Sequence, residues 1–237
     1  MVHLERRAAG PAVTRLLVTG ASGALGGYLL ARLAQLGRAA AAWSGASTGV
    51  RFGVSLRPVD LADLSALERA WHNDAPSVVI HAAAMANVAH CLQAPDRARA
   101  VNVAATDRLA RLAANAGARL LLVSTDLVFG GDRAPYAETD PPAPLSVYGR
   151  TKAEAEQAVL AHPGHAVARV SLLYGPSLTD RPGFFDAQLR VLRDGGAMPL
   201  FEDEWRTPLD LPTAAAASSG WPTPAGQAST TSAGRSG

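Results

Sequence analysis

The sequence is poor in several features that mark particular classes of protein. Its 237 residues include one cysteine, Cys91, which excludes an internal disulfide framework and a cysteine-based zinc site. No apolar run reaches the roughly 18 residues of a membrane span. The formal net charge is only +2, without a basic stripe, so we expect neither a nucleic-acid nor a membrane partner. We expect a cytoplasmic protein without a bound metal.

Lysine is almost absent. Of the 22 basic residues, Lys152 is the one lysine and all the others are arginine. A compact ammonium and a planar guanidinium are not interchangeable. The isolated lysine therefore suggests a position where arginine would not serve.

What remains is an alternation of short apolar runs and helical patterns. We predict strands at 15–19, 39–43, 54–59, 78–80, 120–123 and 166–173, and helices at 27–36, 63–71, 96–116 and 148–160. This order predicts an α/β fold, a doubly wound parallel (Rossmann) sheet. We divide the chain into an N-terminal extension (1–14), a dinucleotide-binding domain (15–175), a partial, incomplete substrate-binding region (176–211) and a low-complexity, disordered tail (212–237).

Three glycines separate the first strand from the first helix. Gly20, Gly23 and Gly26 would let the backbone turn sharply and approach a pyrophosphate at the helix N-terminus. A structural turn without a ligand is the alternative. The expected cofactor contacts in this loop are Gly20, Ser22, Gly23, Ala24, Leu25 and Gly26.

The end of the second strand bears on cofactor choice. No carboxylate follows Trp43, where NAD-binding proteins use one to hold the ribose hydroxyls. Ser44, Thr48 and Arg51 could contact a 2′-phosphate, so NADP(H) is favoured over NAD(H). Asp60-Leu61 would meet the adenine, or Asp60 would cap a helix.

A phenol and an ammonium are four residues apart at Tyr148 and Lys152, which places them on one face of a helix. An ammonium about 5 Å away would lower the phenol pKa by about two units. Thr125, at the end of the fifth strand, could hold a substrate carbonyl. Each residue alone could be structural, but together they predict a proton-transfer site.

These motifs resemble the extended short-chain dehydrogenase/reductase superfamily, and more narrowly the dTDP-4-dehydrorhamnose reductase family. The matching segments are 19–26, 60–61, 81–84, 101–102, 124–131, 148–152 and 169–175. The Ser124-Thr125-Asp126 stretch with its Val128-Phe129 continuation is the most discriminating.

The resemblance implies an NAD(P)H-dependent reductase that delivers hydride to C4 of a 4-keto-6-deoxy sugar nucleotide in dTDP-rhamnose biosynthesis. Catalytic roles would fall on Thr125, Tyr148 and Lys152, the last two also touching the cofactor. His81 is expected to be a packing residue. Further implied contacts are Ala82, Ala83 and Ala84 for the cofactor, and Asp126, Val128, Phe129 and Arg206 for the substrate.

Two alternatives stay open. One is a non-catalytic dinucleotide-binding subunit, like the regulatory subunit of methionine adenosyltransferase. The other is a sugar-nucleotide epimerase or dehydratase that retains its NAD. The expected partner is a nucleotide-sugar substrate, with a homodimer as one option for assembly.

The C-terminal segment departs from the family pattern. Residues 227–237 can be encoded by codons whose third-base frame reads Gly-Ile-Tyr-His-Leu-Gly-Gly-Pro-Glu-Arg, which resembles the family's continuation. We therefore predict a frameshift between about Thr213 and Trp221, which would leave the substrate pocket truncated.

Overall fold

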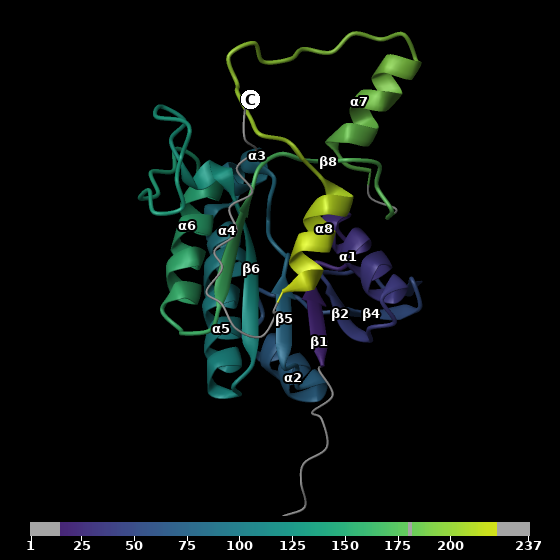
Figure 1. The fold of residues 1–237 in the computed structure, drawn as a ribbon, viewed down its shortest axis with the longest axis vertical. Helices are drawn as coiled ribbons and strands as arrows, with labels where there is room; N and C mark the ends of the chain where they lie inside the picture. The colour runs from purple at the N-terminus through teal and green to yellow at the C-terminus, as the bar shows by residue number, and fades with distance from the viewer. Residues whose placement is uncertain (1–14, 180–181, 222–237) are drawn as a thin grey trace, which may run out of the picture.

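A seven-stranded sheet forms the centre of the molecule (Figure 1). The computed structural model describes residues 15–179 and 182–221. The strands run in the order β3-β4-β2-β1-β5-β6-β7, and β3 is the only one of them that pairs antiparallel to its neighbour. The expected doubly wound parallel sheet is thus confirmed. The strands are β1 (Leu16–Thr19), β2 (Ala40–Ser44), β3 (Val50–Arg51), β4 (Val54–Pro58), β5 (Val78–His81), β6 (Arg119–Thr125) and β7 (Ala166–Val170).

Helices cover both faces of the sheet. Alternate residues of each strand point to opposite faces, so Leu17 and Val79 join one core while Leu16 and Val18 join the other. The first core lies under α2 (Leu64–Asp74), α5 (Ala105–Asn115) and α6 (Val147–Leu160). The second lies under α1 (Ala24–Gln35) and α8 (Leu211–Gly220).

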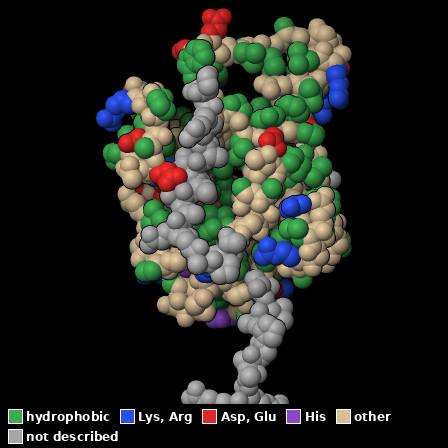
Figure 2. All heavy atoms as spheres, viewed as in Figure 1, with side chains coloured by type: hydrophobic (Ala, Val, Ile, Leu, Met, Phe, Trp, Pro, Cys, Tyr) green, Lys and Arg blue, Asp and Glu red, His purple; other side chains and the backbone are tan. Residues whose placement is uncertain are grey.

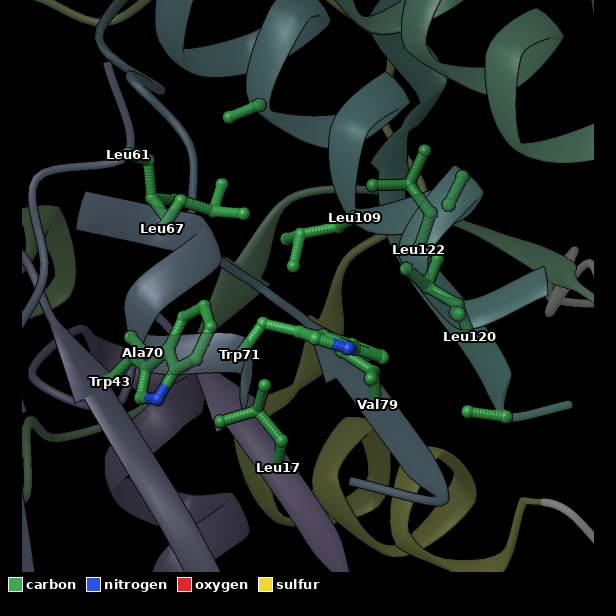
Figure 3. Close-up of a cluster of buried hydrophobic side chains, with 14 of the residues drawn as sticks. Leu17, Trp43, Leu61, Leu67, Ala70, Trp71, Val79, Leu109, Leu120 and Leu122 are labelled. Atoms are coloured by element: carbon green, nitrogen blue, oxygen red, sulfur yellow. The ribbon is translucent and has the colours of Figure 1, made fainter. Parts of the chain in front are cut away.

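Figure 3 shows how the first core is filled. Trp71 and Leu67 of α2 pack in one cluster with Leu17 and Val79 of the sheet. Leu109 of α5 belongs to the same cluster. The Asp63 side chain caps the start of α2 by accepting the backbone N–H of Ala66 at 3.0 Å. The helix predicted at 63–71 is therefore present and extends one turn further, to Asp74.

The long helix predicted at 96–116 is present as three consecutive segments, after the unpredicted α3 (Val88–Gln93). They are α4 (Pro95–Arg99), a π-helical turn (Ala100–Ala104) and α5. The π turn directs Asn102 into the core, where its amide bonds both backbone groups of Met85 and the hydroxyl of Thr151. Such turns commonly mark functional regions, and this one lies between the sheet and α6.

The segment after β7 forms a smaller layer. The strand predicted at 166–173 stops at Val170, and β8 (Leu173–Tyr174) pairs with β9 (Leu209–Asp210) in a separate two-stranded sheet. Between them, α7 (Phe184–Arg193) extends away from the main sheet and has no buried residue (Figure 1). Hydrophobic side chains remain at the surface there, as the green atoms in Figure 2 show. Among the described residues, no helix has the length and apolar character needed to cross a membrane.

Residues 212–220, predicted as the start of a disordered tail, are instead helical, because residues 211–220 form α8. The Asp210 side chain caps this helix, and its Leu211, Ala214 and Ala215 are buried against α1. Alanine is the best helix former, and small side chains let two helices approach closely. A composition that resembles a disordered tail therefore serves here as a packing face. The predicted extension 1–14 and residues 222–237 lie outside the described part.

Candidate functional site

The loop between β1 and α1 can form only with glycine at two of its three predicted positions. Gly20 has a φ of 70°, and a Cβ there would lie 2.7 Å from the backbone N of Ala83 and 2.8 Å from the carbonyl O of Ala82. A Cβ on Gly26 would lie 2.1 Å from the carbonyl O of Gly20. Gly23 is the N-cap of α1 and offers no side-chain cap. The N–H groups of the first turn of α1 are therefore available to an anion.

A cavity of about 240 Å³ opens beside this loop, at the carboxyl edge of the sheet. It is lined by Thr19, Gly20, Ser22, Gly23, Trp43, Ser44, Gly45, Val59, Asp60, Leu61, Ala82, Ala83, Ala84, Arg97 and Val101. Nine of the predicted cofactor contacts are among them. The other five, Ala24, Leu25, Gly26, Tyr148 and Lys152, do not line it.

Six lining residues were not among the predicted contacts: Thr19, Trp43, Gly45, Val59, Arg97 and Val101. Trp43 is almost fully buried, and its indole N–H donates to Asp74 at 2.6 Å. Arg97 comes from α4 and pairs with Asp60 at 2.8 Å across the cavity mouth. No spacing signal links residues 37 positions apart, so only the fold reveals this pair.

The predicted cofactor side chains at the ends of β2 and β4 already have partners. The Ser44 hydroxyl donates to the carbonyl of Ser47, is 3.3 Å from that of Arg57, and is 2% exposed. Ser44 therefore offers the cavity little of its hydroxyl. Asp60 accepts the backbone N–H of Ala62 at 3.0 Å, and this bond together with Arg97 lowers its pKa. It makes a local turn, while Asp63 is the helix cap.

His81, expected to be a packing residue, is the centre of a buried hydrogen-bond chain. Its Nδ1 is 2.6 Å from the hydroxyl of Thr19, and its Nε2 is 2.9 Å from that of Thr106. Thr106 donates its only hydroxyl proton to the carbonyl of Asn102, so it must accept from Nε2–H. Nδ1 then accepts from Thr19, which in turn accepts the backbone N–H of Ala83 at 3.2 Å. Burial lowers the pKa of His81 to about 3, and this neutral tautomer fixes the loop that lines the cavity.

Thr125 and Tyr148 meet at the carboxyl end of β6. A Cβ on Gly149 would lie 2.2 Å from the carbonyl O of Leu127, so glycine lets α6 approach the loop after β6 closely. Ser146 caps α6 and accepts the backbone N–H of Gly149 at 2.9 Å. Thr125 is thereby close enough to Tyr148 to lower the pKa of the phenol, against the burial that raises it. The Thr125 hydroxyl itself donates to Asp126 at 3.2 Å and accepts the backbone N–H of Leu127 at 3.2 Å.

The expected effect of Lys152 on Tyr148 is wrong for this structure. Burial raises the pKa of Tyr148 to about 12, and the titratable neighbours that act on it are Cys91, Asp126 and Arg206. Lys152 is 2% exposed and donates from Nζ to the carbonyl of Val123 at 2.8 Å. Burial lowers the pKa of Lys152 to about 8. The phenol is thus fully protonated at neutral pH, the form required of a proton donor.

Arg206, expected to hold a substrate phosphate, is paired within the chain. It donates to both carboxylate oxygens of Asp126 at 2.8 Å and to Glu204 at 2.7 Å. Ser171 also donates to Asp126, at 2.6 Å. The structure therefore joins two predicted substrate contacts, Asp126 and Arg206, to each other beside Tyr148.

The other two predicted substrate contacts turn inward. Val128 has no exposed surface. The ring of Phe129 is stacked on Tyr136 with centroids 4.3 Å apart, and the Arg169 guanidinium lies 4.9 Å from its centroid. Val128 is thus closed to a substrate, while the half-buried Phe129 has its ring occupied by neighbours within the chain.

Taken together, the arrangement suits a dinucleotide and a carbonyl compound. The cradle between Gly20 and Gly26 leaves no space for side chains, and α1 directs free N–H groups at the position of a pyrophosphate. Ala82 and Ala83 follow β5, and Thr125 ends the adjacent β6, so all three lie at one edge of the sheet. A cofactor in the cavity would end near the Thr125–Tyr148 pair, and open α/β sheets bind ligands at this edge.

Comparison with known proteins gives a consistent picture. Residues 14–219 match the RmlD substrate binding domain family. The chain is 39% identical over 163 residues to methionine adenosyltransferase 2 subunit beta of Pongo abelii, covering 68% of this chain and 47% of that protein. It is 38% identical over 203 residues to dTDP-4-dehydrorhamnose reductase of Mycobacterium tuberculosis, covering 82% and 61%. The crystal structure of dTDP-4-dehydrorhamnose reductase from Bacillus anthracis in complex with NADP has a TM-score of 0.67 at 27% identity, covering 78% and 62%. The match thus spans between about half and three fifths of the length of these curated relatives.

Proposed function

This chain belongs to the RmlD substrate binding domain family, and from that premise we propose that it is an NAD(P)H-dependent reductase. Its substrate would be a 4-keto-6-deoxy sugar nucleotide, as in dTDP-rhamnose formation. The likeness to dTDP-4-dehydrorhamnose reductases at 38% identity supports this class of reaction.

One observation carries the proposal. The Thr125 hydroxyl lies near the Tyr148 phenol, whose pKa it lowers, at the carboxyl edge of the sheet that also bears the glycine loop and the cavity. A hydroxyl that can hold a carbonyl oxygen, next to a phenol that can protonate it, is what ketone reduction requires.

The glycine loop and the cavity would hold the dinucleotide, which when bound would supply the hydride for the ketone carbon. The Thr125 hydroxyl orients the ketone oxygen, and Tyr148 donates its phenolic proton to that oxygen as the alcohol forms. The Lys152 ammonium has three N–H donors, one of which bonds Val123. Another would hold the ribose hydroxyls of the cofactor, and solvent would return the proton to Tyr148.

We further propose a preference for NADP(H). The end of β2 carries Trp43, Ser44 and Gly45, and none of these would repel a 2′-phosphate as a carboxylate does. Tighter binding of NADPH than of NADH, measured by fluorescence titration, is the expected result; equal or reversed affinities would contradict it.

The test of the reductase is oxidation of NADPH upon addition of dTDP-4-dehydrorhamnose, the 4-keto sugar nucleotide in the name of the relative. We expect Tyr148→Phe to abolish turnover and leave the Kd for NADPH unchanged, because Tyr148 does not line the cavity. Tyr174→Phe is the matched control, since Tyr174 is an exposed tyrosine in β8. Turnover by Tyr148→Phe at the wild-type rate would contradict the proposal.

A second candidate is a non-catalytic dinucleotide-binding subunit. The 39% identity to methionine adenosyltransferase 2 subunit beta favours it, and so does the Asp126–Arg206 pairing, which leaves Arg206 engaged within the chain. Under this hypothesis the chain binds NADPH, oxidises none of it with any 4-keto sugar nucleotide, and copurifies with a catalytic partner.

A further inference from the structure

The helix that carries Tyr148 and Lys152 also carries a buried carboxylate. Glu156 lies one turn beyond Lys152 and is 2% exposed. Arg169 of β7 donates to both of its oxygens, at 3.1 Å from Nε and 2.7 Å from Nη2. The Ser124 hydroxyl donates to the same carboxylate.

Two consecutive residues of β6 bind two α6 residues spaced four apart. The Val123 carbonyl accepts from Lys152, and the Ser124 hydroxyl donates to Glu156. Residues four apart on a helix share one face, so this face of α6 is held against the carboxyl end of β6. Tyr148 lies one turn before Lys152 on the same helix. Glu156 thus shares with Lys152 the contact between α6 and β6.

Stability alone does not explain why this position carries an ion pair. Removing two charges from water costs several kcal/mol per ion, and well-packed apolar residues often replace such pairs without loss. The presence of the Glu156–Arg169 ion pair must therefore be explained by the groups around it. Its ionisable neighbour on α6 is Lys152.

Of the titratable groups around Lys152, Glu156 is the one whose charge stabilises the ammonium form. On β5, His81 is held neutral by burial, which lowers its pKa to about 3. On α6, the pKa of Tyr148 is about 12, so the phenol is neutral as well. Arg169, on β7, faces the far side of the carboxylate. Glu156 is the charge that raises the pKa of Lys152, against the burial that lowers it.

We propose that Glu156 is a positioning residue of this site. Its carboxylate, held by Arg169 and Ser124, keeps the buried Lys152 side chain in its ammonium form and directed at the end of β6. This role of Glu156 rests on the proposed reductase function only in the experiments that measure turnover. The charge state of Lys152 can be measured without any substrate.

The chain itself makes the test clean. Lys152 is the only lysine, so protein labelled with carbon-13 at the lysine ε position gives a single side-chain signal that needs no assignment. Its titration in the full-length wild type should report a pKa near 8. A wild-type value at the ordinary 10.5 would overturn the proposal, because the amine would then not be in these surroundings.

The variants test the role of the carboxylate. In Glu156→Gln we expect the pKa of Lys152 to fall by about one unit or more, because the opposite charge is lost. Glu154→Gln is the matched control, since Glu154 is on the same helix in an exposed pair with Arg99 and should change nothing. Circular dichroism and thermal melting establish that each variant is folded.

If Glu156→Gln leaves Arg169 buried without a partner and fails to fold, Glu156→Gln/Arg169→Met removes both charges at similar volume. The same fall in pKa is expected there. A folded variant of either kind in which Lys152 titrates as in wild type would overturn the proposal. Where turnover is present, the alkaline limb of the kcat profile of Glu156→Gln should move to lower pH. An inactive wild type would refute the reductase and leave the lysine titration as it is.

Discussion

Gly26→Ala tests whether the contact between the glycine loop and α1 builds the dinucleotide site. The new Cβ would lie 2.1 Å from the carbonyl O of Gly20 and 2.7 Å from the Cα of Ala21. Both are backbone atoms, so α1 and the loop must separate by about 1 Å to relieve the overlap, which typically costs about 1–3 kcal/mol. Alanine offsets about 1 kcal/mol of this by its higher helix propensity. We therefore expect a lower free energy of unfolding by up to about 2 kcal/mol and a clear loss of NADPH affinity.

Gly27→Ala is the control, because it changes the next residue of the same helix and gains the same propensity. Its Cβ would meet only the end of the Thr179 side chain, at 2.8 Å, with the next atom at 3.6 Å. Urea unfolding measures the free energy of unfolding of both variants, and fluorescence titration measures their affinity for NADPH. Gly26→Ala that binds NADPH as tightly as Gly27→Ala would refute the reasoning.

Three more outcomes follow from the structure. His81 is protonated more readily in the unfolded chain than in the folded one, where its pKa is about 3. Stability should therefore fall by about 1.4 kcal/mol per pH unit as pH drops below about 6.5, and His81→Asn should show a shallower slope in urea unfolding at several pH values. Ala215→Asp places a charge on the buried face of α8 and should lower the free energy of unfolding by about 3 kcal/mol. Ala216→Asp, on the exposed face, should leave it unchanged. Equal melting temperatures of the two variants would contradict this packing of α8. Finally, the gene should show, in its shifted frame after the Thr213 to Trp221 window, the Gly-Gly-Pro peptide; a different peptide there would exclude the frameshift.

The sequence predicted the sheet because its strands correspond to short apolar runs that can be recognised locally. The apolar runs of β1, β5 and β6 are buried on both faces, as continuous apolar runs in a parallel sheet predict. The helix at residues 211–220 was not predictable in this way, since its Ala and Ser residues acquire a buried face only through contact with α1.

The site was predictable where geometry follows from spacing. Glycines three residues apart, and a tyrosine and a lysine four apart, place atoms through the regular structure they are in. The hydrogen-bond and ion-pair partners of these groups come from distant segments of the chain. The spacing of residues in the sequence therefore could not predict them. Lys152 was expected to act on Tyr148, but it bonds Val123 instead, and Arg206 bonds Asp126 across 80 positions of the chain.

In the proposed reaction, hydride and proton reach one carbonyl group beside Thr125 and Tyr148. NADPH carrying deuterium at the transferable position of the nicotinamide tests this most directly, with dTDP-4-dehydrorhamnose as acceptor and mass and NMR analysis of the sugar product. We predict that the deuterium appears at C4 of the sugar in wild type and in Tyr174→Phe, and that Tyr148→Phe gives none. Unlabelled product, label at another carbon, or labelling that persists in Tyr148→Phe would contradict the account.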